Sequence, residues 1–194
     1  MLTEKNFESI RALEGISEKT MTEHYKLYQG YIKKSNEILE KLDSVDKGTA
    51  NQVYSEIRGL KADLSFALGG VKNHEIYFSH LGGPGGKPEG KLLEQIHKDF
   101  GSYENWFSDM KATGMAARGW AWLVYDHDLK RLINYLGDSQ NTYPVWNGTP
   151  ILALDVYEHS YYLDFGTKRA DYIDKFFENL NWEVVDKTFE SLDI

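Results

Sequence analysis

Asp155 and His159 follow directly after a continuously apolar run at 151–154. A buried strand there would hold the carboxylate rigidly, and the turn after it would let the imidazole converge on the carboxylate. The pair therefore has the residue types and spacing of one half of a metal site. Aspartate and histidine four residues apart are also common in proteins without a metal. The pair by itself leaves both interpretations open.

The chain has six histidines and no cysteine. Without cysteine it has no disulfide, no thiolate nucleophile and no thiolate ligand, so a metal site must be built from imidazole and carboxylate. His24 and His74 lie one on each of two expected helices, where both can face inward. Taken singly, each is more usually a histidine with a structural role only. His97 and His127 have charged neighbours and are interpreted as solvated, and His80 fits no single role.

The composition has an acidic balance and is otherwise that of an ordinary globular protein. The chain has 194 residues, of which 41% are hydrophobic and 27% charged, and its formal net charge is −8. That charge argues against nucleic acid or an anionic membrane as a partner. No stretch is long enough to span a bilayer, and residues 1–16 lack the apolar run of a signal peptide. We therefore expect a cytoplasmic protein.

Helical periodicity dominates the first half of the chain. Residues 20–42 and 53–68 have apolar side chains at helical spacing, and a polar turn at 43–48 joins them. These segments predict an antiparallel α-hairpin. Gly69 and Gly70 then interrupt the second helix, and a glycine pair at such a place usually marks a break or close packing.

The pattern changes after a glycine-rich stretch at 81–88. We place a domain boundary there, between an N-terminal domain at 1–82 and a C-terminal domain at 88–194. In the second domain two helical segments precede three β-prone runs, at 120–125, 131–136 and 151–154. The predicted fold class is α+β: an N-terminal antiparallel α-hairpin followed by a C-terminal α/β domain with a small three-stranded antiparallel sheet.

Four segments form a recognisable set. They are Gly-Gly-Val-Lys-Asn-His at 69–74, Gly-Trp-Ala-Trp-Leu-Val at 119–124, Leu-Asp-Val-Tyr-Glu-His-Ser-Tyr-Tyr-Leu at 154–163 and Lys-Arg-Ala-Asp-Tyr-Ile at 168–173. In this order and spacing they resemble the iron/manganese superoxide dismutase family, to which the second and third are highly specific. The resemblance runs over nearly the whole chain, from about residue 16 to about residue 182.

The resemblance implies one iron or manganese ion per chain, held by His24 and His74 of the hairpin and by Asp155 and His159 of the C-terminal domain. It implies a superoxide dismutase, which converts superoxide to oxygen and hydrogen peroxide by alternating the oxidation state of this ion. Three neutral imidazoles and one carboxylate suit a first-row transition metal. These ligands accept iron and manganese alike.

The resemblance also implies Tyr31 and Gln140 as catalytic residues. The family places a glutamine near the metal either four residues before the second ligand, where this chain has Gly70, or on the later hairpin, where it has Gln140. The family's tyrosine usually lies eight residues after the first ligand, but Tyr31 lies seven after His24. We expect Tyr31 to face the funnel to the metal from a helix without a π-bulge. Tyr28 stands where relatives have a histidine that meets the partner's tyrosine, so we expect Tyr28 to lie opposite the partner's Tyr162.

A homodimer is implied as well, with superoxide as the small-molecule substrate. Glu158 and Tyr162 match the residues that bridge the family's two subunits, and Glu158 would reach the partner's His159. The family's aromatic wall around the metal would be formed by Trp120, Trp122 and Tyr157.

Two other functions stay open because the first helix departs from the family pattern. One is a superoxide-dismutase-like metalloprotein with other oxygen chemistry. The other is a scaffold or binding protein that keeps a lapsed site. Metal content distinguishes the scaffold or binding protein from the two metalloproteins. Turnover of superoxide distinguishes the metalloprotein with other oxygen chemistry from a superoxide dismutase.

Overall fold

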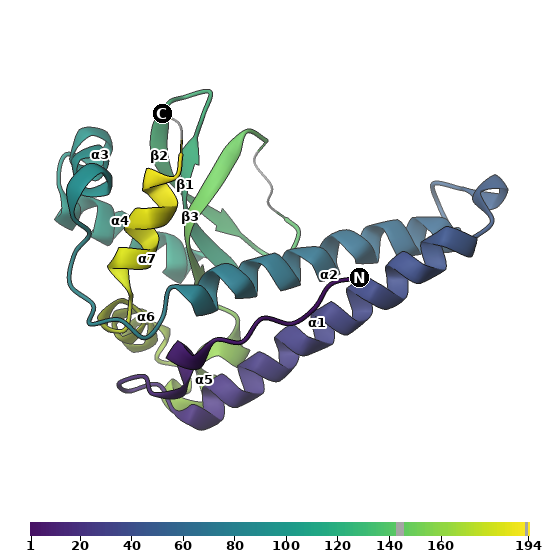
Figure 1. Ribbon diagram of the computed structural model, residues 1–194, viewed down its shortest axis with the longest axis horizontal. Coiled ribbons are helices and arrows are strands. Elements are labelled where there is room, and N and C mark those ends of the chain that lie inside the picture. Colours follow the sequence, from purple (N-terminus) through teal and green to yellow (C-terminus); the bar gives the residue numbers. More distant parts are fainter. Residues whose placement is uncertain (143–145, 193) are drawn as a thin grey trace.

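The computed structural model describes residues 1–142, 146–192 and 194. Two long helices form a hairpin that extends away from a sheet and its surrounding helices (Figure 1). Together these elements confirm the predicted α+β class. In chain order the elements are a 3₁₀ helix (Glu8–Arg11), α1 (Glu18–Ser44), a 3₁₀ helix (Lys47–Thr49), α2 (Glu56–Ser79), α3 (Gly90–Phe100), α4 (Tyr103–Ala116), β1 (Trp120–Asp126), β2 (Arg131–Gly137), β3 (Gly148–Asp155), α5 (Glu158–Phe165), α6 (Arg169–Glu178) and α7 (Trp182–Glu190).

The hairpin helices begin at serine caps. The side chains of Ser17 and Ser55 each accept a hydrogen bond from the backbone three residues further on, which satisfies one of the free N–H groups at the start of a helix. The second helix therefore begins at Glu56, later than the apolar spacing predicts, and Val53 lies outside it with its side chain exposed.

In the described part of the chain, no helix has the length and apolar character needed to cross a membrane.

The glycine pair marks close packing and not a break, since α2 continues through Gly69 and Gly70 to Ser79. A Cβ atom on Gly69 would lie 2.1 Å from the backbone oxygen of Gln140, and one on Gly70 would lie 2.6 Å from the ring of Tyr31. Only glycine lets α2 approach both α1 and the loop after β2 this closely.

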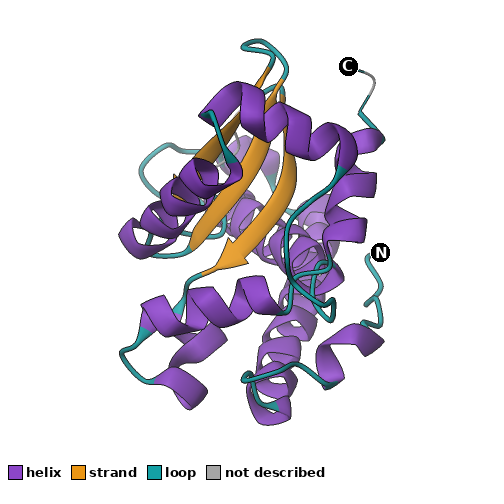
Figure 2. Ribbon diagram, turned by 90° about the vertical axis from the view of Figure 1, so that its left-hand side faces the viewer, coloured by secondary structure: helices purple, strands orange, loops and turns teal. Residues whose placement is uncertain are grey.

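The sheet has the strand order β2-β1-β3, and both pairings are antiparallel, as predicted. Its central strand β1 is buried along its whole length, and its first residue, Trp120, pairs with Gly137 on one side and with Asp155 on the other. The register with β3 shifts between Leu123 and Val124. Figure 2 shows the strands side by side among the helices, and in Figure 1 α3, α4 and α7 lie to the left of the sheet that they contact. This pairing fixes the place of Asp155 at the end of β3.

The two halves of the chain meet along several elements. Helix α1 contacts α5, and α2 contacts β3. Just after α2, Leu81 and Leu180 form an isolated antiparallel bridge, and the backbone oxygen of His80 accepts a hydrogen bond from the N–H of Asn181 at 2.6 Å. The hairpin is thus held against the C-terminal half at its end as well as along its length.

Candidate metal centre

Four different elements each bring one candidate ligand to the same place. His24 comes from α1, His74 from α2, Asp155 from the end of β3, and His159 from the first turn of α5. One ligand atom of each residue lies within 4.8 Å of those of the other three. The first three residues are fully buried, and His159 is partly buried. The structure therefore brings together all four residues that the sequence predicts as metal ligands.

The separations between these atoms fit a shared metal ion. Oδ2 of Asp155 lies 3.1 Å from Nε2 of His24, 3.6 Å from Nε2 of His74 and 3.2 Å from Nε2 of His159. Atoms that each lie about 2.0–2.2 Å from one ion, the usual length for imidazole and carboxylate ligands, have separations of this size. The donor set of imidazole and carboxylate suits iron or manganese.

His74 gives the most direct sign of a missing partner. Its Nδ1 donates a hydrogen bond of 2.6 Å to the backbone oxygen of Gly70, which leaves the lone pair on Nε2. Nε2 is buried, and no described residue offers it a hydrogen bond. Leaving a buried polar atom unpaired costs about 1–3 kcal/mol. A metal ion at this atom would remove that cost.

The electrostatics favour the metal-binding forms of His24, His74 and Asp155, though not that of His159. Burial lowers the pKa of His24, and burial together with the nearby His24 lowers the pKa of His74 to about 3, so both rings are neutral at pH 7. Burial alone would raise the pKa of Asp155, but the neighbouring imidazoles of His159 and His24 outweigh it and hold that pKa well below its usual range. Burial works to lower the pKa of His159, but the Asp155 carboxylate raises it overall.

The end of β3 is held by hydrogen bonds that fix the Asp155 carboxylate. Its Oδ1 accepts from the backbone N–H of Tyr157 at 2.9 Å, and its backbone oxygen accepts from the hydroxyl groups of Tyr172 at 2.8 Å and Ser160 at 3.1 Å. Tyr77 contacts the Tyr172 hydroxyl in turn, at 3.1 Å. Sequence reasoning missed Tyr77 and Tyr172 as supports of the site. Their only signal was the motif at 168–173, which contains Tyr172.

Tyr31 and Gln140 lie beside the four candidate ligands. Gln140 is buried; its Oε1 accepts from Nε1 of Trp120 at 3.0 Å, and its Nε2 donates to the hydroxyl of Tyr31 at 3.3 Å. The ring of Tyr31 lies 5.5 Å from that of His74, between centroids. Helix α1 is α-helical throughout, so Tyr31 reaches the site without a π-bulge. A catalytic role for Tyr31 and Gln140 stays a prediction.

Aromatic rings surround the centre. Trp120 meets His74 edge-on with ring centroids 5.3 Å apart, and Tyr157 stacks on His159 at 5.2 Å. Trp122 stacks behind Trp120 at 6.2 Å and so lies one ring further from the candidate ligands.

The expected place of Tyr28 at a subunit interface is wrong. Its side chain is completely buried within its own chain, against the rings of Phe7 and Phe78. Its hydroxyl accepts from the backbone N–H of Lys5 at 2.9 Å and donates to Glu75 at 3.0 Å. Its own chain therefore covers the side chain of Tyr28, which leaves none of it exposed for contact with a second subunit.

Comparisons with known proteins agree with this site. The family model for the alpha-hairpin domain of iron/manganese superoxide dismutases matches residues 8–82, and the model for their C-terminal domain matches residues 88–188. Over 184 residues the chain is 44% identical to a superoxide dismutase [Fe] of Aquifex pyrophilus and 43% identical to one of Aquifex aeolicus (strain VF5), with 92% of this chain and 86% of each relative covered. It is 38% identical to a superoxide dismutase [Mn] of Haloarcula marismortui, over 90% of this chain and 86% of the relative. The chain therefore belongs to the iron/manganese superoxide dismutase family.

Proposed function

We propose that this protein is a superoxide dismutase, which converts two superoxide ions and two protons to one molecule of oxygen and one of hydrogen peroxide. The observation that carries the proposal is the convergence of three imidazoles and one carboxylate from four elements on one buried point. The names of the relatives in Aquifex and Haloarcula support it.

His24, His74, Asp155 and His159 would hold the metal. An iron or manganese ion bound there would supply the exchange of one electron with superoxide, in opposite directions in the two halves of the reaction. The buried hydrogen bonds around the carboxylate and around Nδ1 of His74 keep the donor atoms in place before the metal arrives. The chain thus presents a preorganised site.

Tyr31 and Gln140 would manage a proton beside this site. Burial raises the pKa of Tyr31, which is half-buried, so its hydroxyl stays protonated. Gln140 holds that hydroxyl through Nε2, and Trp120 holds Gln140 through Oε1. We therefore propose the half-buried Tyr31 hydroxyl as a positioned proton donor beside the site.

We also propose a homodimer through Glu158 and Tyr162. Both side chains are exposed, Tyr162 to 51%, and the neighbouring Leu163 is exposed to 56%. Glu158 makes no hydrogen bond or ion pair through its side chain with any residue that the structure describes. A carboxylate behind a ligating imidazole orients the ring and raises its basicity, which is the role we propose for Glu158 at the partner's His159.

The division into domains at 1–82 and 88–194 is likewise a proposal. The ranges of the two family matches support it, because both end or begin at the glycine-rich linker. A cytoplasmic location and an antioxidant role also remain proposals from the sequence.

Elemental analysis and a dismutase assay on the same sample test the function. We expect about one iron or manganese ion per chain in the protein isolated from its own cells, with activity that follows this metal content. His74→Ala removes a buried donor atom and should lose both metal and activity. Stoichiometric zinc with neither iron nor manganese would overturn the proposal, whereas iron or manganese without turnover of superoxide would favour other oxygen chemistry.

A further inference from the structure

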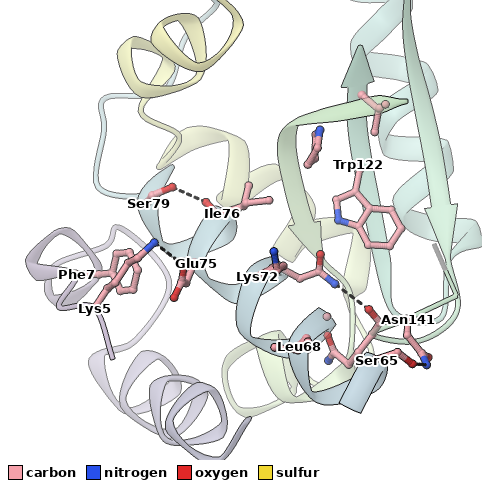
Figure 3. Close-up of a pocket in the computed structure, with 16 residues that line it drawn as sticks. Lys5, Phe7, Ser65, Leu68, Lys72, Glu75, Ile76, Ser79, Trp122 and Asn141 are labelled. Carbon is pink, nitrogen blue, oxygen red and sulfur yellow. Dashed lines mark hydrogen bonds and ion pairs between the residues drawn. The ribbon is translucent and has the colours of Figure 1, made fainter. Parts of the chain in front are cut away.

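A cavity lies between α2 and the sheet, apart from the candidate metal centre. It has a volume of about 770 Å³ and is bounded by α2, by strands β1 and β3 and by the N-terminal segment (Figure 3). Sites for small organic ligands usually measure about 300–1,000 Å³. Its apolar lining consists of Phe7, Leu68, Ile76, Trp122, Val124 and Pro150. We call this cavity the α2 hollow.

The α2 hollow has a positive balance of charge. Three of its lining residues are charged: Lys5, Lys72 and Glu75. Both oxygens of Glu75 are occupied, one by Nζ of Lys5 at 2.5 Å and the other by the hydroxyl of Tyr28 at 3.0 Å. Lys72 has no ion pair or hydrogen bond through its ammonium group with the residues that the structure describes. On a chain with net charge −8, the hollow therefore offers one unpaired cation beside an apolar wall.

Gln140 separates the α2 hollow from the metal centre. Its side chain points to Tyr31 and Trp120, whereas its backbone oxygen accepts a hydrogen bond from Nδ2 of Asn73, which lines the hollow. None of the four candidate metal ligands lines the hollow. The hollow is thus a separate place for a ligand.

We propose that the α2 hollow binds a flat, mostly apolar organic monoanion of the aromatic carboxylate class. The carboxylate pairs with Lys72, and the ring packs between α2 and the side chains of Trp122 and Pro150. One unpaired cation matches one negative charge, whereas a nucleotide with several phosphates requires more cations than the hollow offers. The two aromatic side chains of the lining, Phe7 and Trp122, and its apolar remainder suit an aromatic ring. This inference does not depend on the proposed dismutase activity.

Isothermal titration of the metal-loaded protein with two matched probes tests the proposal. Naphthalene-2-carboxylate and naphthalene-2-carboxamide have the same ring, but only the first has a charge. At low ionic strength we expect one site per chain and about fivefold tighter binding of the carboxylate, as a partly exposed ion pair contributes up to about that factor.

Three variants locate the binding. Lys72→Gln should bind naphthalene-2-carboxylate and naphthalene-2-carboxamide with about equal affinity, because the ring still binds and the cation is lost. Leu68→Trp should abolish binding of both probes by filling the hollow. Lys91→Gln is the matched control, because Lys91 is an exposed lysine on α3 that does not line the hollow. It should keep the wild-type preference.

Three results would overturn the proposal. The first is no binding of either probe to the wild-type protein. The second is equal loss of preference in Lys72→Gln and Lys91→Gln. The third combines two observations: the wild-type protein binds neither probe, and Lys72→Gln sediments differently from wild type. Together they would mean that a second copy of the chain covers the hollow.

Discussion

Tyr31 lies seven residues after His24, where the resemblance implies eight, and its contacts still reach the site. Its hydroxyl is held by Gln140, and its ring fits against Gly70, where a Cβ atom would lie 2.6 Å away. The backbone oxygen of Gly70 in turn accepts from Nδ1 of His74. One glycine therefore makes room for Tyr31, the proposed proton donor, and orients a candidate ligand.

Tyr31→Phe should keep the metal and lower turnover at high superoxide. The ring still fills its space, but the proton on the hydroxyl is lost. Efficient dismutases work near the diffusional ceiling of about 10⁸–10⁹ M⁻¹s⁻¹, so proton supply becomes limiting only when substrate is abundant. A positioned proton donor usually raises a reaction rate about 10²–10⁴-fold, but water replaces the donor in part here. We therefore expect the rate at saturating superoxide to fall by a factor of up to about ten.

Pulse radiolysis over a range of superoxide concentrations measures this effect. Tyr28→Phe is the control, since Tyr28 is buried away from the candidate ligands and contacts Lys5 and Glu75. It should behave as wild type. Equal behaviour of Tyr31→Phe and wild type at every concentration would mean that Tyr31 only packs.

His80 should make the protein less stable in acid. Burial lowers its pKa to about 4, and its Nδ1 has no hydrogen-bond partner among the described residues. The folded-state pKa lies below the ordinary value of 6.5, so unfolding takes up a proton below about pH 6.5. The contribution of neutral His80 to the free energy of unfolding is therefore fully present above about pH 6.5. It is lost as the pH falls toward 4, by about 3 kcal/mol in all.

His80→Leu should remove this part of the pH dependence. Urea unfolding of variant and wild type between pH 7 and pH 4.5 measures the difference in free energy, which should shift in favour of the variant as the pH falls. His97→Gln, at an exposed histidine on α3, should instead run parallel to wild type. Parallel curves for His80→Leu would show that His80 does not titrate on unfolding.

At this scale the sequence allowed part of the site to be derived from the residues themselves. Asp155 and His159 follow one strand, so their proximity is a local matter. Helical spacing places His24 and His74 on the inner faces of their helices, but it does not set the level at which two helices face each other, and the resemblance supplied that match. The burial of His80 had no local signal, because it results from contact with a loop a hundred residues later in the chain.

At the scale of the elements, helix α2 contributes to both the candidate metal centre and the α2 hollow. Apolar spacing predicts its existence but not its start, which depends on the cap at Ser55. It also leaves the glycine pair ambiguous, because a break and close packing both explain glycine in a helix. Packing decided the outcome: Gly69 and Gly70 each face an atom that no other residue type would clear.

Two glycines of α2 should respond in opposite ways to alanine. Nothing lies within 4 Å of a Cβ atom on Gly59, so Gly59→Ala should stabilise the protein by about 1 kcal/mol through helix propensity. A Cβ atom on Gly69 would lie 2.1 Å from the backbone oxygen of Gln140, so Gly69→Ala should cost about 1–3 kcal/mol and lower activity by moving Gln140. Urea unfolding and the dismutase assay measure both. Equal stabilisation by the two substitutions would contradict the observed packing.

At the scale of the whole molecule, the candidate metal centre joins the two halves of the chain. The hairpin supplies His24 and His74, and the C-terminal half supplies Asp155 and His159. The predicted fold class held at this scale because periodicity and turn residues identify the elements. The packing of the N-terminal segment against Tyr28 was not predictable from the sequence. It depends on contacts between residues far apart in the chain that no periodicity or motif connects.

Glu158→Ala should weaken both association and metal retention if the proposed homodimer is right. The substitution removes the carboxylate proposed to lie behind the partner's His159, and loss of such a contact usually lowers metal affinity about 10–100-fold. Sedimentation and metal content after dialysis against a chelator measure the two effects. Glu183→Ala, at an exposed residue of α7, is the control. A Glu158→Ala protein that stays a dimer with full metal would show that the interface lies elsewhere. A monomeric variant with full metal and activity would show that metal retention does not need the contact with the partner's His159.

The unbroken course of α1 has a consequence that is best expressed as helical phase. An α-helix advances by about 100° per residue, so seven residues return to the starting direction within about 20°. His24 and Tyr31 are seven residues apart and therefore point the same way from a regular helix. A spacing of eight would turn the tyrosine by about a further 100° unless a π-bulge took up the extra residue. The spacing of seven residues in this chain therefore needs no bulge. One more residue between His24 and Tyr31 would turn Tyr31 away from Gln140 unless α1 acquired a bulge with it.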